Sequence, residues 1–212
     1  MPTDHTVLQV LDVWVATKYL GQDVGSLAFL RAMAPVRLFD IPWEQVLCKH
    51  LLPFFSLKDL FHLRGLCTEF RDLIDCHFSL AFTVNTTQCS ATFSQIAFSV
   101  LTRRNCCLKE LVLCNARDWL SDETLIPVLQ NNPSLEKVDL SNCLSLSNAS
   151  LYSVGAQCRK MRILSFRGCV WVSGAGLISL IANKLPLEHV DLCGCWDLND
   201  DDIITLAMEC PQ

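Results

Sequence analysis

Residues 108–116 have the sequence LKELVLCNA, and the same pattern recurs three more times before the end of the chain. The later copies are LEKVDLSNC at 135–143, MRILSFRGC at 161–169 and LEHVDLCGC at 187–195. The four copies start at Leu108, Leu135, Met161 and Leu187, so the period is nearly constant. Such a period indicates one supersecondary unit that is repeated, in which each copy buries its apolar side against the next copy.

The spacing of leucines within each copy is that of a leucine-rich repeat, in which a short strand, a turn and a helix form one unit. Residues at the first, fourth and sixth positions of a copy, such as Leu135, Val138 and Leu140, are expected to point into the core because side chains alternate along a strand. Residues 108–212 are therefore predicted to form four repeats of a right-handed solenoid. Because the last copy ends at Gln212 without a capping segment, further repeats are expected after it.

The helices of the repeats are predicted from apolar residues at helical spacing after each strand. These residues are Leu125, Val128 and Leu129; Leu151 and Val154; Leu177, Leu180 and Ile181; and Ile203, Leu206 and Ala207. Residues 77–107 are predicted to be an atypical first repeat that caps the core, because the end of a solenoid needs cover. In that segment Leu80, Phe82 and Val84 predict a strand, whereas Ile96, Val100 and Leu101 predict a helix.

The composition indicates a soluble, core-rich protein. Hydrophobic residues make up 51% of the 212 residues, charged residues make up 18%, and the net charge is −5. A disordered chain has the opposite composition. No basic surface that could bind nucleic acid is indicated.

The segment from Met1 to Tyr19 lacks a positive leader, and Asp12 and Lys18 interrupt its apolar stretch, so neither a secretory signal nor a membrane span is predicted. We expect a cytoplasmic protein, with the nucleus as a second location.

Three cysteines recur with the repeat period, namely Cys143, Cys169 and Cys195. We interpret them as a structural column at the turn after each strand. The strand spacing of about 4.8 Å would permit disulfides, but a reducing compartment opposes them. A metal or redox site is the alternative, and it lacks the paired spacing of a zinc site. Acidic residues at Asp197 and 200–202 are expected to precede a helix, with a metal site as the alternative. No metal or cofactor is predicted.

A catalytic motif is not found in the sequence. The five histidines are scattered, and Gly174 and Gly176 form only a G-x-G pair, which is short of a phosphate-binding loop. A non-enzyme is therefore predicted, and a thiol-dependent enzyme is the weaker alternative.

The first third of the chain is predicted to be helical. Residues 1–37 are expected to be an extension, with one helix over the apolar positions from Val7 to Leu20. Residues 38–76 are expected to contain three short helices, the second opened by a capping box of Ser56 and Asp59 and ended by Gly65. A unit this small has too little interior to bury all its apolar residues, so some are expected to remain exposed for a partner.

The segments LFDIPWEQVL at 38–47, LLPFFSLKDL at 51–60 and FRDLI at 70–74 resemble an F-box. Their position before leucine-rich repeats of the cysteine-containing subtype resembles the F-box/LRR family. The resemblance implies a non-catalytic substrate-recognition subunit of an SCF-type ubiquitin ligase. In such a subunit the F-box docks a Skp-family adaptor, which leads to a cullin–RING scaffold, and the repeats bind a protein substrate. A repeat scaffold or inhibitor without a ligase is the alternative.

The resemblance and the repeat register together imply two sets of contact residues. The residues expected to bind the adaptor are Ile41, Pro42, Leu47, Leu51, Leu57, Leu60, Leu63 and Phe70. The residues expected to bind substrate lie on the open face of the strands or in the loops that follow them: Lys137, Asp139, Ser165, Arg167, His189, Asp191, Trp119, Trp171 and Trp196. For each tryptophan, packing against the next loop is the alternative to substrate contact.

Overall fold

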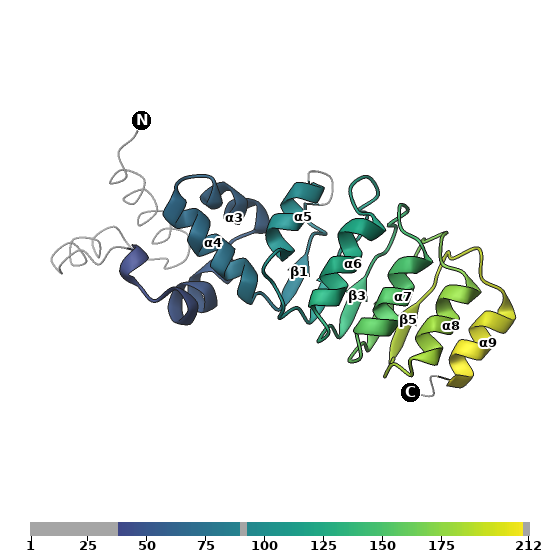
Figure 1. The fold of residues 1–212 in the computed structure, drawn as a ribbon. Coiled ribbons are helices and arrows are strands. Elements are labelled where there is room, and N and C mark those ends of the chain that lie inside the picture. The colour runs from purple at the N-terminus through teal and green to yellow at the C-terminus, as the bar shows by residue number, and fades with distance from the viewer. Residues whose placement is uncertain (1–37, 90–92, 210–212) are drawn as a thin grey trace, which may run out of the picture. The chain divides into compact units, whose positions relative to one another are not determined.

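The structure is a computed structural model that describes residues 38–89 and 93–209, shown in Figure 1. The chain divides after Leu51 into two compact units. The helix predicted within residues 1–37 lies outside the described residues. Among the residues that are described, no helix has the length and apolar character needed to cross a membrane.

The described part of the first unit consists of two short helices. A 3₁₀ turn, η2, covers Leu38–Asp40, and a wide helix, η3, covers Trp43–Leu51. The carbonyl of Pro42 accepts from the amides of Val46 and Leu47 at 3.1 and 3.3 Å. The indole of Trp43 donates to the carbonyl of Phe39 at 3.2 Å and connects the two helices.

The second unit begins with three helices that follow one another closely. These are a 3₁₀ turn η4 at Leu52–Phe54, α3 at Leu57–Arg64 and α4 at Thr68–Leu80. The predicted capping box is confirmed, because the Ser56 hydroxyl accepts from the Asp59 amide at 3.2 Å and the Asp59 carboxylate accepts from the Ser56 amide at 3.3 Å. Gly65 ends α3 as predicted. Helix α4 continues to Leu80, so the boundary expected at residues 76–77 falls inside a helix.

Five parallel strands follow one another across one sheet in chain order. Their central residues pair in one row, Val84–Leu111–Val138–Leu164–Val190. The strands are β1 Thr83–Asn85, β2 Glu110–Val112, β3 Lys137–Asp139, β4 Ile163–Ser165 and β5 His189–Asp191. The first strand is shorter than expected, since Leu80 belongs to α4 and Phe82 precedes β1.

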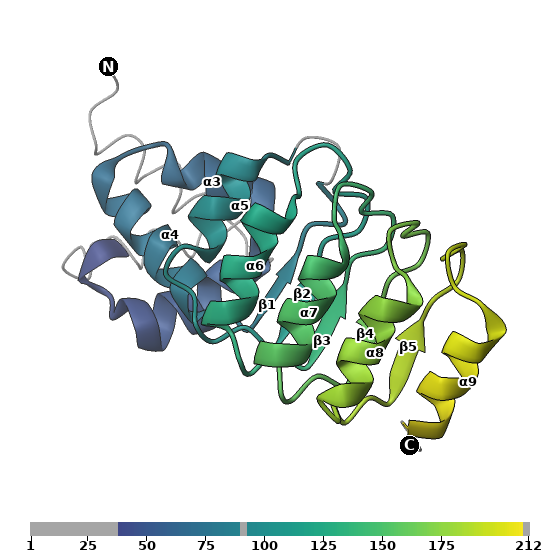
Figure 2. The same cartoon turned by 45° about the vertical axis from the view of Figure 1, so that its right-hand side comes forward.

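One helix follows each strand, and these helices cover the same face of the sheet (Figure 2). The helices are α5 Gln95–Thr102, α6 Asp122–Asn131, α7 Asn148–Gln157, α8 Gly174–Ala182 and α9 Asp200–Glu209. The prediction of an α/β fold is confirmed at the level of a parallel sheet with a helix after each strand.

The core lies between the sheet and its helices. The inward strand residues Leu135, Val138 and Leu140 are fully buried, as predicted. Facing them, Leu125 of α6 and Val154 of α7 are also fully buried. Three core positions predicted for the helices are wrong. Ile203 and Ala207 of α9 are exposed, and Ile96 of α5 is 78% exposed while its neighbour Phe98 takes the buried place.

The chain leaves each repeat strand through one residue with left-handed backbone geometry. The φ angles are +62° at Asn115, +57° at Asn142, +71° at Gly168 and +78° at Gly194. Only glycine and, less readily, asparagine adopt this geometry at low cost. The N/G position of the repeat pattern is therefore a backbone requirement, and it directs the following loop back toward the helix face.

Candidate functional site

Four of the eight residues expected to bind an adaptor are buried within this chain. The exposed fractions of Leu47, Leu60, Leu63 and Phe70 are 2%, 5%, 9% and 3%. These four side chains are therefore covered within the chain and are not exposed for a partner. In the second unit the reason is packing of α3 against α4, in which Phe61 contacts Phe78 with a ring separation of 5.4 Å.

The other four residues of that set retain access to solvent. Ile41, Leu51 and Leu57 are half-buried, and Pro42 is exposed. These positions are the ones that an adaptor could contact without unfolding α3 or α4.

The largest exposed apolar side chains in the helical region were not in the predicted set. In the second unit Phe54 is 63% exposed and Leu66 is 52% exposed, and in the first unit Val46 is 40% exposed. The sequence contained one usable signal. Leu66 follows the helix-ending Gly65, outside the periodic face of α3, so its side chain was not needed for the helix core.

The polar residues predicted on the open face of the strands satisfy one another. The Asp139 carboxylate accepts from the Ser141 amide at 2.9 Å and from the Ser141 hydroxyl at 2.5 Å. That hydroxyl also lies 2.9 Å from the Ser165 hydroxyl. Asp191 accepts from the Cys193 amide at 2.9 Å in the same way. These aspartates therefore shape the ends of their strands and have less capacity left for a partner.

The other predicted strand-face residues are more accessible. Lys137 is half-buried on β3, Arg167 is exposed after β4, and His189 is exposed on β5. Lys137 and His189 lie in one row of the sheet through Ile163, and Arg167 is four residues after Ile163. Because side chains alternate along a strand, the three are expected on the same face. They remain candidates for contact with a partner protein.

The three predicted tryptophans occupy three different environments. Trp119 packs between Phe93 and Phe98, with ring separations of 5.2 and 5.3 Å, and its indole nitrogen is buried. Trp171 packs on Phe166 at 5.8 Å and donates to the carbonyl of Cys143 at 2.6 Å. Trp119 and Trp171 therefore pack against other residues of the repeats, which is the alternative to substrate contact, and both remain partly exposed. Trp196 is 85% exposed and stays a candidate.

A row of exposed residues runs along the loops that follow the strands, and the sequence analysis did not identify it. The row is Arg117, Leu144, Val170 and Trp196, which we call the loop row. The exposed fractions of Leu144, Val170 and Trp196 are 43%, 54% and 85%. The signal was present in the sequence, because each apolar member directly follows a cysteine of the repeated column. Large exposed side chains arranged in one row are typical of a protein contact surface.

The cysteine column is structural, as predicted. The thiols of Cys143, Cys169 and Cys195 are buried and donate to the carbonyls of Leu113, Leu140 and Phe166, each at 3.1 Å. Burial raises the pKa of Cys143 to about 12 and that of Cys169 to about 12. All cysteines among the described residues carry free thiols. A buried thiol with a raised pKa is a poor nucleophile, which argues against a redox or catalytic role for the column.

The acidic residues near the last helix form its cap. The Asp202 carboxylate accepts from the Asn199 amide at 3.1 Å, and the Asn199 side chain accepts from the Asp202 amide at 3.0 Å. Asp200, Asp201 and Asp202 occupy the first turn of α9, where the positive end of the helix dipole favours carboxylates. Within residues 38–89 and 93–209, no three potential metal ligands come together.

Comparisons with known proteins give one group of clear relatives. The chain is 37% identical to F-box/LRR-repeat protein 15 of Mus musculus over 123 residues, and 36% identical to the Rattus norvegicus protein over the same length. These matches cover 58% of this chain, and the chain spans 41% of the length of each relative. A weaker match is Antagonist of mitotic exit network protein 1 of Candida glabrata, 26% identical over 106 residues, covering 49% of this chain and 20% of that protein.

The comparisons with family models and with solved structures give weaker information about the chain than the sequence matches do. No family model matches the chain. Among solved structures, Leiomodin-1 Actin-Binding Site 2 (ABS2) matches 84% of this chain and 90% of that chain, with a TM-score of 0.47 and 13% identity. The likeness to known proteins therefore comes from the sequence matches: over 123 residues the chain is similar to F-box/LRR-repeat protein 15.

Proposed function

We propose that this chain is a substrate-recognition subunit of an SCF-type ubiquitin ligase. In this proposal the helical region 38–76 docks a Skp-family adaptor that leads to a cullin–RING scaffold, and the repeats form a right-handed solenoid that holds a protein substrate. The observation that carries the proposal is the 37% identity to F-box/LRR-repeat protein 15 over 123 residues. The receptor itself would catalyse nothing; it would raise the effective concentration of substrate near the ubiquitin-transfer enzyme.

The exposed apolar residues decide where the adaptor would dock. Because Leu60, Leu63 and Phe70 are buried, replacing them would test folding and not docking. Phe54 and Leu66 of the second unit combine large apolar side chains with high exposure, as interface anchors do. In the second unit we assign the adaptor contact to these two residues and Leu57. In the first unit we assign it to the accessible members of the predicted set, which are Ile41, Pro42 and Leu51.

The repeats would hold the substrate through the loop row and the accessible strand-face residues. Leu144, Val170 and Trp196 supply apolar anchors from three successive loops. Lys137, Arg167 and His189 supply polar contacts. Arg117 adds a positive charge in the position of the row that precedes Leu144.

Co-expression of the full chain with a Skp-family adaptor tests the proposal. The expected result is a stable complex on size-exclusion chromatography, which F54D combined with L66D abolishes. The matched control is I178D, which places the same charge on an exposed apolar residue of α8. If the wild-type chain and the adaptor elute separately, the ligase assignment is wrong.

The burial of Leu47, Leu60, Leu63 and Phe70 favours one second function. A helical region that covers these side chains itself needs no adaptor for its interior. The chain would then be a repeat protein that binds partners without a ligase. In that case the loop-row variants L144D and W196D impair partner binding, whereas no adaptor complex forms with any variant.

A further inference from the structure

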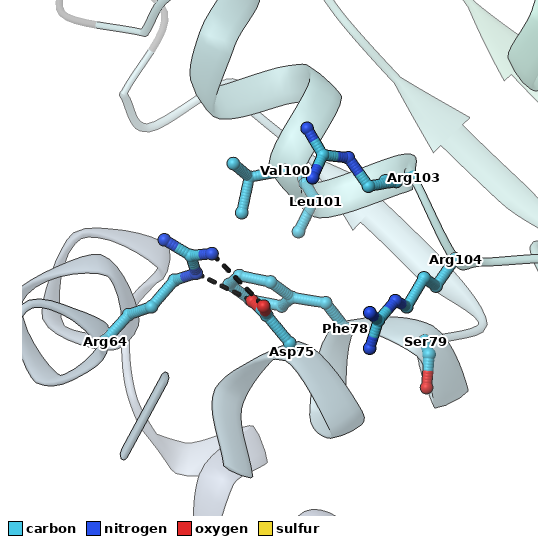
Figure 3. A pocket seen from close by; sticks show the side chains of 8 residues that line it. All are labelled: Arg64, Asp75, Phe78, Ser79, Val100, Leu101, Arg103 and Arg104. Atoms are coloured by element: carbon cyan, nitrogen blue, oxygen red, sulfur yellow. Dashed lines mark hydrogen bonds and ion pairs between the residues drawn. The ribbon is translucent and has the colours of Figure 1, made fainter. Parts of the chain in front are cut away.

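A shallow pocket lies between α4 and α5 in the second unit (Figure 3). Three apolar side chains, Phe78, Val100 and Leu101, form part of its wall. The other lining residues are polar, and all but one of them are charged: Arg64, Asp75, Ser79, Arg103 and Arg104. Neither the adaptor contact nor the loop row includes any of these residues, so the pocket is a separate feature of the molecule.

One arginine of the pocket is held in place by the one carboxylate. The Nε of Arg64 donates to one oxygen of Asp75 at 2.6 Å, and its Nη2 donates to the other oxygen at 3.1 Å. The hydrogen bonds that Arg64 donates to the Asp75 carboxylate raise the pKa of Arg64 above its ordinary value, so the side chain is a permanent cation. This bidentate geometry uses both carboxylate oxygens and leaves the Nη1 nitrogen of Arg64 for another acceptor.

The other two arginines bring charge that the pocket does not neutralise. Arg103 and Arg104 directly follow the last residue of α5, and both are exposed. Among the described residues, ion pairs are formed by Arg64 with Asp75, Lys109 with Glu136, and Arg162 with Glu188. Neither Arg103 nor Arg104 takes part in any of them.

The pocket carries a net positive charge, whereas the chain as a whole carries a net negative charge. The pocket is lined by three arginines and one aspartate, whereas the whole chain has a net charge of −5. Apolar walls strengthen electrostatic attraction because they lower the local dielectric. A cation would be repelled from this pocket, and an anion would be attracted.

We propose that this pocket binds a single oxyanion, either a phosphoryl group or a carboxylate. The planar fork of a guanidinium matches both groups through paired N–H donors. Arg64 supplies a fixed donor from α3, and Arg103 and Arg104 line the pocket from the segment that follows α5. Their guanidinium groups extend in different directions in Figure 3, so both side chains would turn toward a bound anion. Such an anion would connect the helical region to the first strand–helix unit. The site is independent of the proposed ligase function, and its ligand is either a free anion or a modified or acidic residue on a polypeptide.

Calorimetric titration of the full chain at low ionic strength, without phosphate in the buffer, tests this site. The probes are inorganic phosphate, a phosphoserine hexapeptide, the same hexapeptide with glutamate, and the unmodified serine hexapeptide. The expected result is saturable binding of at least one anionic probe and none of the serine peptide. R103A combined with R104A should weaken that binding at least tenfold.

The control is K160A combined with K184N, which removes two exposed positive charges from other parts of the second unit. Asparagine is used at Lys184 because it tolerates the positive φ angle at that position. This control should bind the probe as the wild type does. Binding of phosphate alone identifies a free anion as sufficient, and binding restricted to a peptide identifies a polypeptide source. The proposal is overturned if no anionic probe saturates, or if the control loses as much affinity as R103A/R104A.

Discussion

The thiol of Cys169 donates a hydrogen bond of 3.1 Å to the backbone carbonyl of Leu140 in the preceding repeat. This contact joins two residues that are 29 positions apart in the sequence. The same contact joins Cys143 to Leu113 and Cys195 to Phe166. The carbonyls of Leu140 and Phe166 also accept from the backbone amides of Cys143 and Cys169, so the thiol of the next repeat is their second donor. The column therefore connects successive repeats.

Replacing Cys169 with alanine should destabilise the protein by about 2 kcal/mol, because a small cavity forms in the core and the Leu140 carbonyl loses one of its two donors. Cys169→Ser should cost less, since its hydroxyl can still donate. Urea unfolding monitored by circular dichroism measures both changes. Cys193→Ser is the control, since Cys193 is exposed. Equal stability of C169A and C193S would contradict a structural column.

Alkylation of the native protein should separate the cysteines by burial. With a pKa of about 12, Cys143 and Cys169 should be thiolate at a fraction on the order of 10⁻⁴ at pH 8. Exposed Cys106 and Cys193 should therefore react with iodoacetamide well before them. Mass spectrometry of peptides after timed labelling measures the order. Early labelling of Cys143 would show that its repeat opens readily.

The same raised pKa values predict a loss of stability at high pH. The folded thiols hold their protons up to about pH 12, whereas unfolded thiols release theirs near the ordinary value of 9.0. The unfolded state therefore binds fewer protons in this window, and the free energy of unfolding falls as the pH rises from about 9 toward 12. The urea midpoint should decline between pH 8.5 and 10.5. C143A combined with C169A should flatten that decline.

Gly168 should not tolerate a side chain. Its φ angle is +71°, and a Cβ atom at this position would lie 2.4 Å from Oδ1 of Asn142. Gly168→Ala should lower the free energy of unfolding by about 2 kcal/mol from backbone strain and crowding. Gly65→Ala is a matched control, because Gly65 has no positive φ and its nearest atom would be 3.4 Å away. Thermal unfolding of both variants measures the contrast, and a stable G168A would show that the turn can relax.

Asn132 should be among the most sensitive polar positions. Its fully buried side chain donates to the carbonyls of Val128 and Asn105 and accepts from the amide of Leu108 at 3.0 Å. Asn132→Ala leaves three buried backbone groups without partners and should cost about 3 kcal/mol. Asn131→Ala, at the exposed neighbouring position, should change stability little. Chemical unfolding compares the two, and equal effects would mean that water replaces the lost bonds.

Substitution by alanine should reduce stability at Trp119 and partner binding at Trp196. Trp119 packs against two phenylalanines, so Trp119→Ala should cost about 3 kcal/mol of stability. Trp196 is 85% exposed, so Trp196→Ala should leave stability unchanged and, if the loop row binds substrate, reduce partner binding. Unfolding curves measure the first effect. A large loss of stability in W196A would show that Trp196 supports the fold, which would contradict its role as a contact residue.

The sequence alone determined the features that depend on neighbouring residues or on the repeat period. The capping box of Ser56 and Asp59 forms within one turn, so its residues were sufficient to predict it. The buried row at Leu111, Val138 and Leu164 follows from alternation within short strands. The regular repeat period brought Cys143 and Cys169 into one column because consecutive repeats are adjacent in space.

Only the tertiary structure decided which apolar residues remain exposed. Leu60 and Phe54 are equally apolar in the sequence, but packing of α3 against α4 buries Leu60 and leaves Phe54 63% exposed. Trp119 is enclosed by phenylalanines that belong to the preceding repeat. The pairing of Arg64 with Asp75 likewise joins different helices. Local patterns cannot specify such contacts, because burial depends on the distances between side chains that are remote in sequence.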